Sequence, residues 1–207
     1  MMTQPRLSNS TRNPIRTAVM SLSLVTVLAC GGCLSKPALK RQNFAFDNPS
    51  PVSPSQAGQV ISVRAVIVSA LFDRQAFVYR MSTEAYETDP YAQFLVAPSR
   101  AITIAVRENL LNSGLFKDVV GAGSLLKADK TVEVYVTELY GDFSKDGKPA
   151  AILSLRVLVS DAASSAHKSF ARRIALKENT AAAVMTGWDQ AMSEIMKDVA
   201  SYLASAK

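Results

Sequence analysis

One segment in the C-terminal half of the chain alternates strictly between valine and other residues. Val132, Val134 and Val136 occupy every second position of Thr131–Leu139 (TVEVYVTEL), and the residues between them are Glu, Tyr and Thr. Because successive side chains of a β-strand point to opposite faces of a sheet, this pattern predicts a strand with one buried face. The rest of the chain must therefore supply elements that cover the valine face.

Several other segments favour strands of the same sheet. The β-branched run 60–68 (VISVRAVIV) predicts a central strand. Segment 141–149 is typical of a hairpin turn, with Asp146-Gly147 at its tight corner. Shorter strands are expected at 43–47, 76–81, 151–160 and 168–176, with an irregular, aromatic-rich crossing at 83–96.

Two further segments predict helices. Pro98 suits the first turn of a helix, where a missing N–H costs nothing, and Gly114 provides a C-terminal stop. Thr180 is a candidate N-cap, and apolar residues then recur at three- and four-residue steps from Val184 to Tyr202. The element order predicts an α/β fold, a two-layer sandwich in which a mostly antiparallel or mixed β-sheet carries two main helices on one face.

Composition narrows the classes of function. The chain has 207 residues with one His and two Cys, so a metal site would need mainly carboxylate ligands. The histidine, His167, lies in an Ala/Ser-rich turn, and no nucleophile or phosphate-binding motif of the usual spacing is visible. Asp73, Glu84, Glu87 and Asp89 are interpreted as solvated loop charges. We therefore expect neither an enzyme nor a cofactor.

The net charge does not indicate a nucleic-acid-binding protein. The formal charge is +6, but Arg6, Arg12 and Arg16 all precede the folded part of the chain. No stripe of Lys and Arg interleaved with aromatic residues is present in the sequence. Nucleic acid is accordingly not an expected partner.

The N-terminus predicts a lipid-modified leader. Arg12 and Arg16 precede an uncharged apolar run at 17–29, which is too short for a membrane span of about 20 residues but has the length of a signal-peptide core. Val-Leu-Ala then precedes Cys30, a pattern that resembles a bacterial lipobox. Cys33 is the alternative acylation site, and an ordinary cleaved signal with incidental cysteines is a further alternative.

These features divide the chain into three parts. We expect a lipoprotein signal peptide at 1–29, a lipidated tether at 30–42 and a folded domain at 43–207. The residue after Cys30 is Gly31, not the Asp that resembles an inner-membrane retention signal. In a bacterium with two membranes, this favours a lipid-anchored protein on the periplasmic face of the outer membrane.

An aromatic-rich stretch before the first helix is a candidate partner surface. Phe77, Tyr79, Tyr86, Tyr91 and Phe94 exceed what one short connection needs for packing. Tyrosine is favoured at interfaces because its ring is apolar and its tip is polar. Core packing is the competing interpretation, and the residues alone leave both open.

The same region resembles a known family. Its motifs lie in the order FDRQAFVYR at 72–80, YE at 86–87, DPY at 89–91, FL at 94–95, Pro98, LLNSGLF at 110–116 and Val119. This order resembles the ABC-type transport auxiliary lipoprotein family, of the paraquat-inducible outer-membrane lipoprotein type. The resemblance covers about 44–203.

The resemblance implies a non-catalytic component of a system that moves phospholipids or related hydrophobic molecules between the two membranes. It implies two partners, namely the membrane, through the lipid anchor, and a mammalian-cell-entry-type periplasmic protein. Homo-oligomerisation is left open. We expect the protein contact at Tyr79, Arg80, Tyr86, Tyr91 and Phe94. The alternatives are a carrier that itself binds a phospholipid, and a lipoprotein that regulates envelope assembly.

Overall fold

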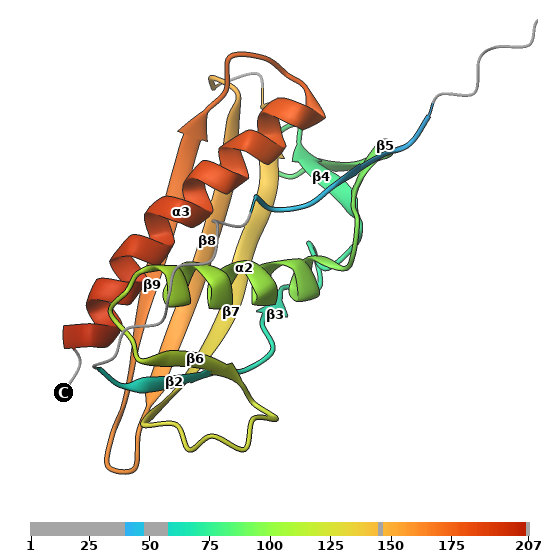
Figure 1. Cartoon of the computed structure of the whole chain (residues 1–207). Helices are drawn as coiled ribbons and strands as arrows, with labels where there is room; N and C mark the ends of the chain where they lie inside the picture. Colours follow the sequence, from blue (N-terminus) through green and yellow to red (C-terminus); the bar gives the residue numbers. More distant parts are fainter. Residues whose placement is uncertain (1–39, 48–57, 145–146, 206–207) are drawn as a thin grey trace, which may run out of the picture. The chain divides into compact units, whose positions relative to one another are not determined.

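The computed structural model describes residues 40–47, 58–144 and 147–205 (Figure 1). The expected signal peptide, both cysteines and most of the tether lie outside the described residues. The same holds for Asp146, one of the two residues expected at the tight corner of the hairpin.

The sheet is organised around β7 (Lys130–Asp142), which contains the alternating valines. One edge of β7 pairs antiparallel with β8 (Ala150–Ser160) over almost its full length. β8 pairs in the same way with β9 (Ser165–Ala175). These three long strands form one half of the sheet.

The other edge of β7 is shared by three short strands, all parallel to it. β2 (Val60–Val63) pairs near its start, β3 (Ile67–Val68) near its middle and β4 (Ala76–Arg80) at its end. β2 and β4 therefore lie at opposite ends of β7, which separates the segments that they carry.

Three further strands extend these short ones. β6 (Asp118–Gly121) pairs parallel with β2, and β5 (Tyr86–Phe94) pairs antiparallel with β4. β1 (Gln42–Phe44) pairs parallel with β5. The described residues thus form a nine-stranded mixed sheet.

Two helices, α2 (Pro98–Asn112) and α3 (Ala181–Ser205), lie on the same face of this sheet (Figure 1). Pro98 begins α2, and Gly114 follows its end with a φ of 68°, a conformation that glycine adopts without strain. The Thr180 hydroxyl accepts a hydrogen bond from the Ala183 N–H, as an N-cap does. The predicted two-layer α/β sandwich is confirmed. No helix in the described part of the chain is long and apolar enough to cross a membrane.

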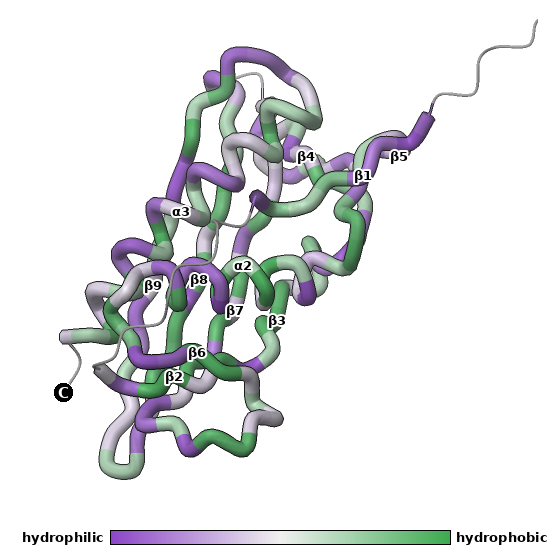
Figure 2. Tube along the Cα trace, in the orientation of Figure 1, coloured by the Kyte–Doolittle hydropathy of each residue, from purple (hydrophilic) through white to green (hydrophobic). Residues whose placement is uncertain are grey.

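Large side chains fill the space between the helices and the sheet. Hydrophobic residues recur along the helices and strands that enclose this space (Figure 2). The Val132, Val134 and Val136 side chains are buried, as their alternation predicts. Trp188 of α3 is fully buried, and its indole N–H donates to the Ile152 carbonyl oxygen of β8 at 3.1 Å. This bond fixes α3 on β8.

The structure corrects the expected strand at 60–68. It is split into β2 and β3, because the chain leaves the ladder after Val63. The Val66 N–H donates instead to the Thr103 hydroxyl of α2 at 2.8 Å. This short connection between the two strands therefore lies against the helix.

Four other expectations change as well. The expected irregular crossing at 83–96 contains β5, and the connection after α2 contains β6. β7 continues to Asp142, inside the expected turn, because β4 pairs with Gly141 and Asp142. His167 lies in β9 and not in a turn, and its side chain is exposed.

Candidate functional site

The alternation of β4 places the predicted contact residues on two different faces of the sheet. Tyr79 faces the helices, where its ring lies 4.9 Å from the ring of Phe143 and its hydroxyl donates to the Asp89 carboxylate at 2.7 Å. Arg80, the next residue, points to the opposite face. We call that face, which α2 and α3 do not cover, the back face.

Tyr79 is held in place by these contacts. Burial raises the pKa of its hydroxyl well above the ordinary value, and the hydrogen bond to Asp89 and the charge of that carboxylate raise it further. Asp89 also accepts hydrogen bonds from the Tyr91 and Ala92 N–H groups, so it is not the solvated loop charge that we expected. Tyr79 therefore supports the local structure of β5.

Phe94 belongs to the core, which corrects its expected role as a contact residue. Its side chain is only 2% exposed. Its ring centroid lies 4.7 Å from that of Phe77 and 5.4 Å from that of Trp188. Phe77 and Phe94, two of the five residues of the aromatic stretch, are therefore core residues.

Tyr91 is exposed but lies apart from the other predicted residues. It sits toward the far end of β5, beside Ala92, which pairs with Gln42 of β1. Its position places it near β1, the strand that pairs with β5.

Arg80 and Tyr86 do come together, on the back face. They are directly opposite each other in the pairing of β4 with β5. The Arg80 guanidinium lies 5.1 Å from the centroid of the Tyr140 ring, and the Tyr86 ring meets Tyr140 edge-on at 5.7 Å. Phe72 completes the group, with its ring 5.6 Å from Tyr140 and 6.1 Å from Tyr86. We call these four residues the back-face cluster.

A buried carboxylate anchors this cluster. Asp142 is 2% exposed and accepts hydrogen bonds from Arg80 Nη2 at 2.7 Å, from Arg173 Nη1 and from the Ser144 hydroxyl at 2.8 Å. Burial alone would raise the pKa of Asp142, but the hydrogen bonds from Arg80, Arg173 and Ser144 outweigh it and hold the pKa well below its usual range. Asp142 is therefore ionised at neutral pH, and two arginines share one negative charge.

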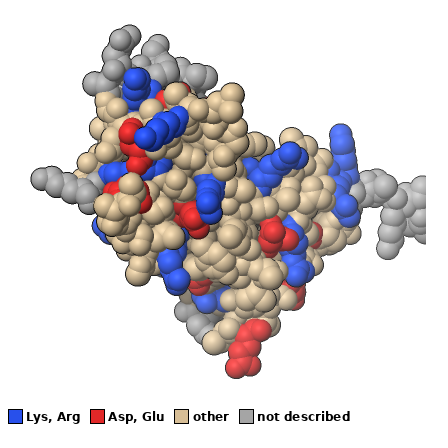
Figure 3. Space-filling model, turned by 90° about the horizontal axis from the view of Figure 1, so that it is seen from below, with Lys and Arg blue, Asp and Glu red and all other residues tan. Residues whose placement is uncertain are grey.

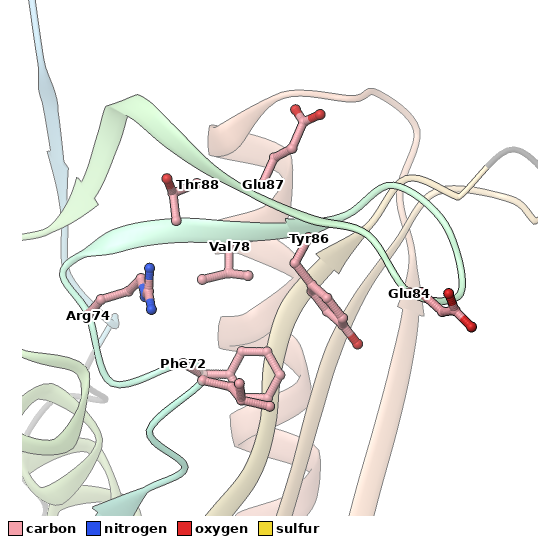
Figure 4. A pocket seen from close by; sticks show the side chains of 8 residues that line it. Phe72, Arg74, Val78, Glu84, Tyr86, Glu87 and Thr88 are labelled. Atoms are coloured by element: carbon pink, nitrogen blue, oxygen red, sulfur yellow. The ribbon is translucent and has the colours of Figure 1, made fainter.

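A pocket of about 460 Å³ opens beside the cluster (Figure 4). Phe72 and Tyr86 lie close together on one side of it, with Val78 and Arg74 next to them, while Glu84 points away at the tip of the β4–β5 hairpin. Leu71, which also lines the pocket, is 68% exposed. An exposed leucine beside two aromatic rings offers apolar surface to a partner.

Sequence reasoning found only two members of this site, Arg80 and Tyr86. Leu71, Phe72, Tyr140, Asp142 and Arg173 were missed, because the pairing of β4 with the end of β7 is what unites them. No local pattern marks Asp142, since the strand before it already contains Glu133 and Glu138.

The site has no features of a metal centre. Among residues 40–47, 58–144 and 147–205, no three His, Cys, Asp or Glu side chains are grouped so that they could hold a metal ion. On the face seen in Figure 3, positive and negative side chains are interspersed, so that face has no field of a single sign. On the back face, the exposed Tyr86 and Leu71 lie beside an arginine that is paired with Asp142.

Solved structures with low sequence identity share this fold. A protein from Xanthomonas campestris, described as a member of the DUF330 family, is 15% identical with a TM-score of 0.65, over 78% of this chain and 92% of its own. A crystal structure of an uncharacterised protein is 16% identical with a TM-score of 0.66, over 79% and 99% of the two chains. A hypothetical protein from Chlamydia trachomatis is 13% identical with a TM-score of 0.50, over 72% and 100%.

These comparisons show the class of fold, a two-layer α/β domain. The model of one family, the ABC-type transport auxiliary lipoprotein component, matches residues 44–201. The chain belongs to this family. No curated protein matches the chain.

Proposed function

We propose that the protein is an outer-membrane lipoprotein, acylated at Cys30, whose domain docks a mammalian-cell-entry-type protein in the periplasm. Membership of the transport auxiliary family makes it an accessory component of an ABC transport system. In this proposal the anchor and tether hold the domain at the membrane. The domain has no catalytic role, and it links the outer membrane to the periplasmic protein.

The observation that carries the docking role is the exposed Tyr86 of the back-face cluster, beside the pocket that it lines. Tyr86 is 45% exposed and rests on buried Tyr140, so its ring is held in place before a partner arrives. Rigid aromatic residues and arginines dominate the binding energy of many protein interfaces. Arg80, fixed by Asp142, adds an oriented positive charge next to that ring.

The filled core favours docking over the carrier alternative. A carrier needs an apolar cavity that can receive acyl chains, and it would lie between the helices and the sheet. Here that space is occupied by Trp188, Phe77, Phe94 and their fully buried neighbours. A lipid could enter only if these side chains moved apart.

The proposal is tested by photo-crosslinking in native envelopes. A photo-reactive phenylalanine derivative replaces Tyr86 in the full chain, and captured molecules are identified by mass spectrometry. Leu125, in the β6–β7 loop at the other end of the sheet, is the control position. It is fully exposed, so non-specific capture would be greatest there.

Capture of a mammalian-cell-entry-type protein at Tyr86 but not at Leu125 is the expected result. Recovery of phospholipid without a protein partner would replace docking by the carrier alternative. Capture of cell-wall or outer-membrane assembly proteins alone would favour the regulatory alternative and overturn the proposal.

A further inference from the structure

A second pocket lies on the helix side, between α2 and the connection from β2 to β3. It has a volume of about 400 Å³. Arg100, Ile104 and Arg107 line one wall at four- and three-residue steps, so they share one face of α2. Ala65 and Val66 line the opposite wall. The pocket is thus an apolar groove with a guanidinium group from each of two helical turns.

The charges of this groove are not balanced. Both charged residues that line it are arginines, and neither forms a hydrogen bond or ion pair with another residue in the described ranges. The other arginine nearby, Arg64, is paired with Glu133 at 3.1 Å. On the back face, by contrast, Asp142 compensates Arg80 and Arg173. The groove therefore carries two positive charges without a counter-charge from the described residues.

One of these arginines has a buried donor without an acceptor. Arg107 Nε is inaccessible to solvent and has no hydrogen-bond partner among the described residues. A buried donor left unpaired is costly, and the cost is larger for a charged group. The Arg107 guanidinium also lies close to Gly121 of β6, where an added Cβ would be 3.5 Å from Nη1. The side chain is therefore held against β6, and its Nη groups, not the buried Nε, are the donors left for a ligand in the groove.

The chemistry of the groove selects its ligand. Guanidinium groups match the geometry of phosphate and carboxylate oxygens, and arginine binds phosphate through paired N–H donors. Ile104, 44% exposed between the two arginines, gives an apolar surface that a bare ion would leave uncovered. The hydroxyl of Ser99 is a further polar group on the wall.

We propose that this groove binds a phosphate or phosphodiester group that carries an apolar substituent. Arg107 and Arg100 are the donors, and Ile104 contacts the substituent. The ligand accepts hydrogen bonds from the Nη groups of the two guanidinium ions. This site is separate from the back-face cluster, and the inference does not depend on the docking proposal.

The test is isothermal titration of the purified full chain with two probes. Inorganic phosphate represents the free anion, and dihexanoyl-phosphatidylglycerol represents a lipid headgroup with short acyl chains. Arg107→Gln is the test variant. Arg156→Gln is the control, because Arg156 is an exposed arginine of β8 that does not line the groove. We expect Arg107→Gln to weaken binding by about tenfold or more, and Arg156→Gln to leave it unchanged.

The probes also separate the two sources of the anion. Tighter binding of the lipid than of phosphate supports the full proposal, with a lipid headgroup as ligand. Equal binding of the lipid and of phosphate overturns the proposed contact between Ile104 and an apolar substituent, and leaves a site for free phosphate. Absence of binding by both probes, or equal binding by wild type and Arg107→Gln, overturns the site itself.

Folding is controlled independently. Because Arg107 Nε has no partner in the described residues, Arg107→Gln is expected to unfold at the same temperature as wild type or higher without ligand. If this variant fails to fold, Arg100→Gln, which changes a more exposed side chain, provides the same comparison.

Discussion

Gly187 of α3 lies directly against Ala151 of β8. A Cβ built at Gly187 would come within 2.6 Å of the Ala151 Cβ and within 3.0 Å of Leu176 Cδ2. Carbon atoms in folded proteins do not approach this closely without displacement of one of them. The separation between α3 and the sheet therefore depends on the absence of a side chain at position 187.

The first prediction is that Gly187→Ala destabilises the protein. Overpacking of a close contact costs about 1–3 kcal/mol, which equals or exceeds the roughly 1 kcal/mol that alanine gains over glycine in a helix. The free energy of unfolding is measured by urea titration, with the fluorescence of Trp188, the only tryptophan, as the signal. Gly123→Ala is the control, because no atom lies within 4 Å of the Cβ added there. Equal stability of Gly187→Ala and wild type would contradict the close packing.

The elements with strong local signals could be predicted from the sequence. Pro98 marks the start of α2, Thr180 caps α3, and the valine alternation of β7 defines its buried face. β5 was missed, because its sequence includes Pro90 and a run of exposed polar residues, which do not alternate as a half-buried strand does. The division of one edge of β7 among three short parallel strands is set by pairing between distant segments, and no local pattern encodes it.

The candidate site was predicted only in part, for the same reason. A stretch rich in aromatic residues indicates neither which rings face the core nor which face the solvent. The bulge in the pairing of β4 with β5 shifts the register between Ala76 and Val78, so simple alternation along β5 does not decide it. Arg173 reaches Asp142 from β9, 31 residues further along the chain, and nothing in the sequence around either residue indicates that contact.

The second prediction concerns Asp142 as the anchor of the back face. Asp142→Asn removes the charge that Arg80 and Arg173 share, so we expect a loss of about 2–3 kcal/mol in the free energy of unfolding. Asp198→Asn is the matched control, because Asp198 forms an exposed pair with Arg172, and such pairs contribute about 0–1 kcal/mol. Urea titration of both variants at neutral pH provides the measurement. Similar losses in the two would mean that Asp142 is no more important than a surface acid.

The third prediction is the pH dependence that follows from the same carboxylate. The folded protein holds the pKa of Asp142 below its usual range. The unfolded chain has the ordinary value of about 3.9. The carboxylate therefore stabilises the fold fully above about pH 4, and this contribution is lost as the pH falls toward the folded value. The stability difference between wild type and Asp142→Asn should shrink between about pH 6 and about pH 3. A constant difference across that range would show that the charge of Asp142 is not the stabilising feature.

The fourth prediction separates partner contact from general exposure of tyrosine. Tyr86 and Tyr135 are 45% and 40% exposed, but only Tyr86 belongs to the back-face cluster. Tyr86→Ser should reduce co-purification of the periplasmic partner by about tenfold or more, as expected for the loss of a central aromatic contact. Tyr135→Ser should leave co-purification unchanged. Equal effects of the two substitutions would remove the cluster from the docking surface.

The fifth prediction distinguishes the two cysteines that could carry the lipid. Only a thiol forms the thioether, and Cys30 has the small Ala29 before it, whereas Gly32 precedes Cys33 within a poorer pattern. Cys30→Ser should therefore abolish lipid attachment and release the protein from the outer-membrane fraction, while Cys33→Ser should leave both unchanged. The mass of the N-terminal peptide shows whether it carries the lipid. Density separation of the membranes shows where the protein is located. The opposite result would assign acylation to Cys33, and retention of both variants in the membrane would mean that neither cysteine alone anchors the chain.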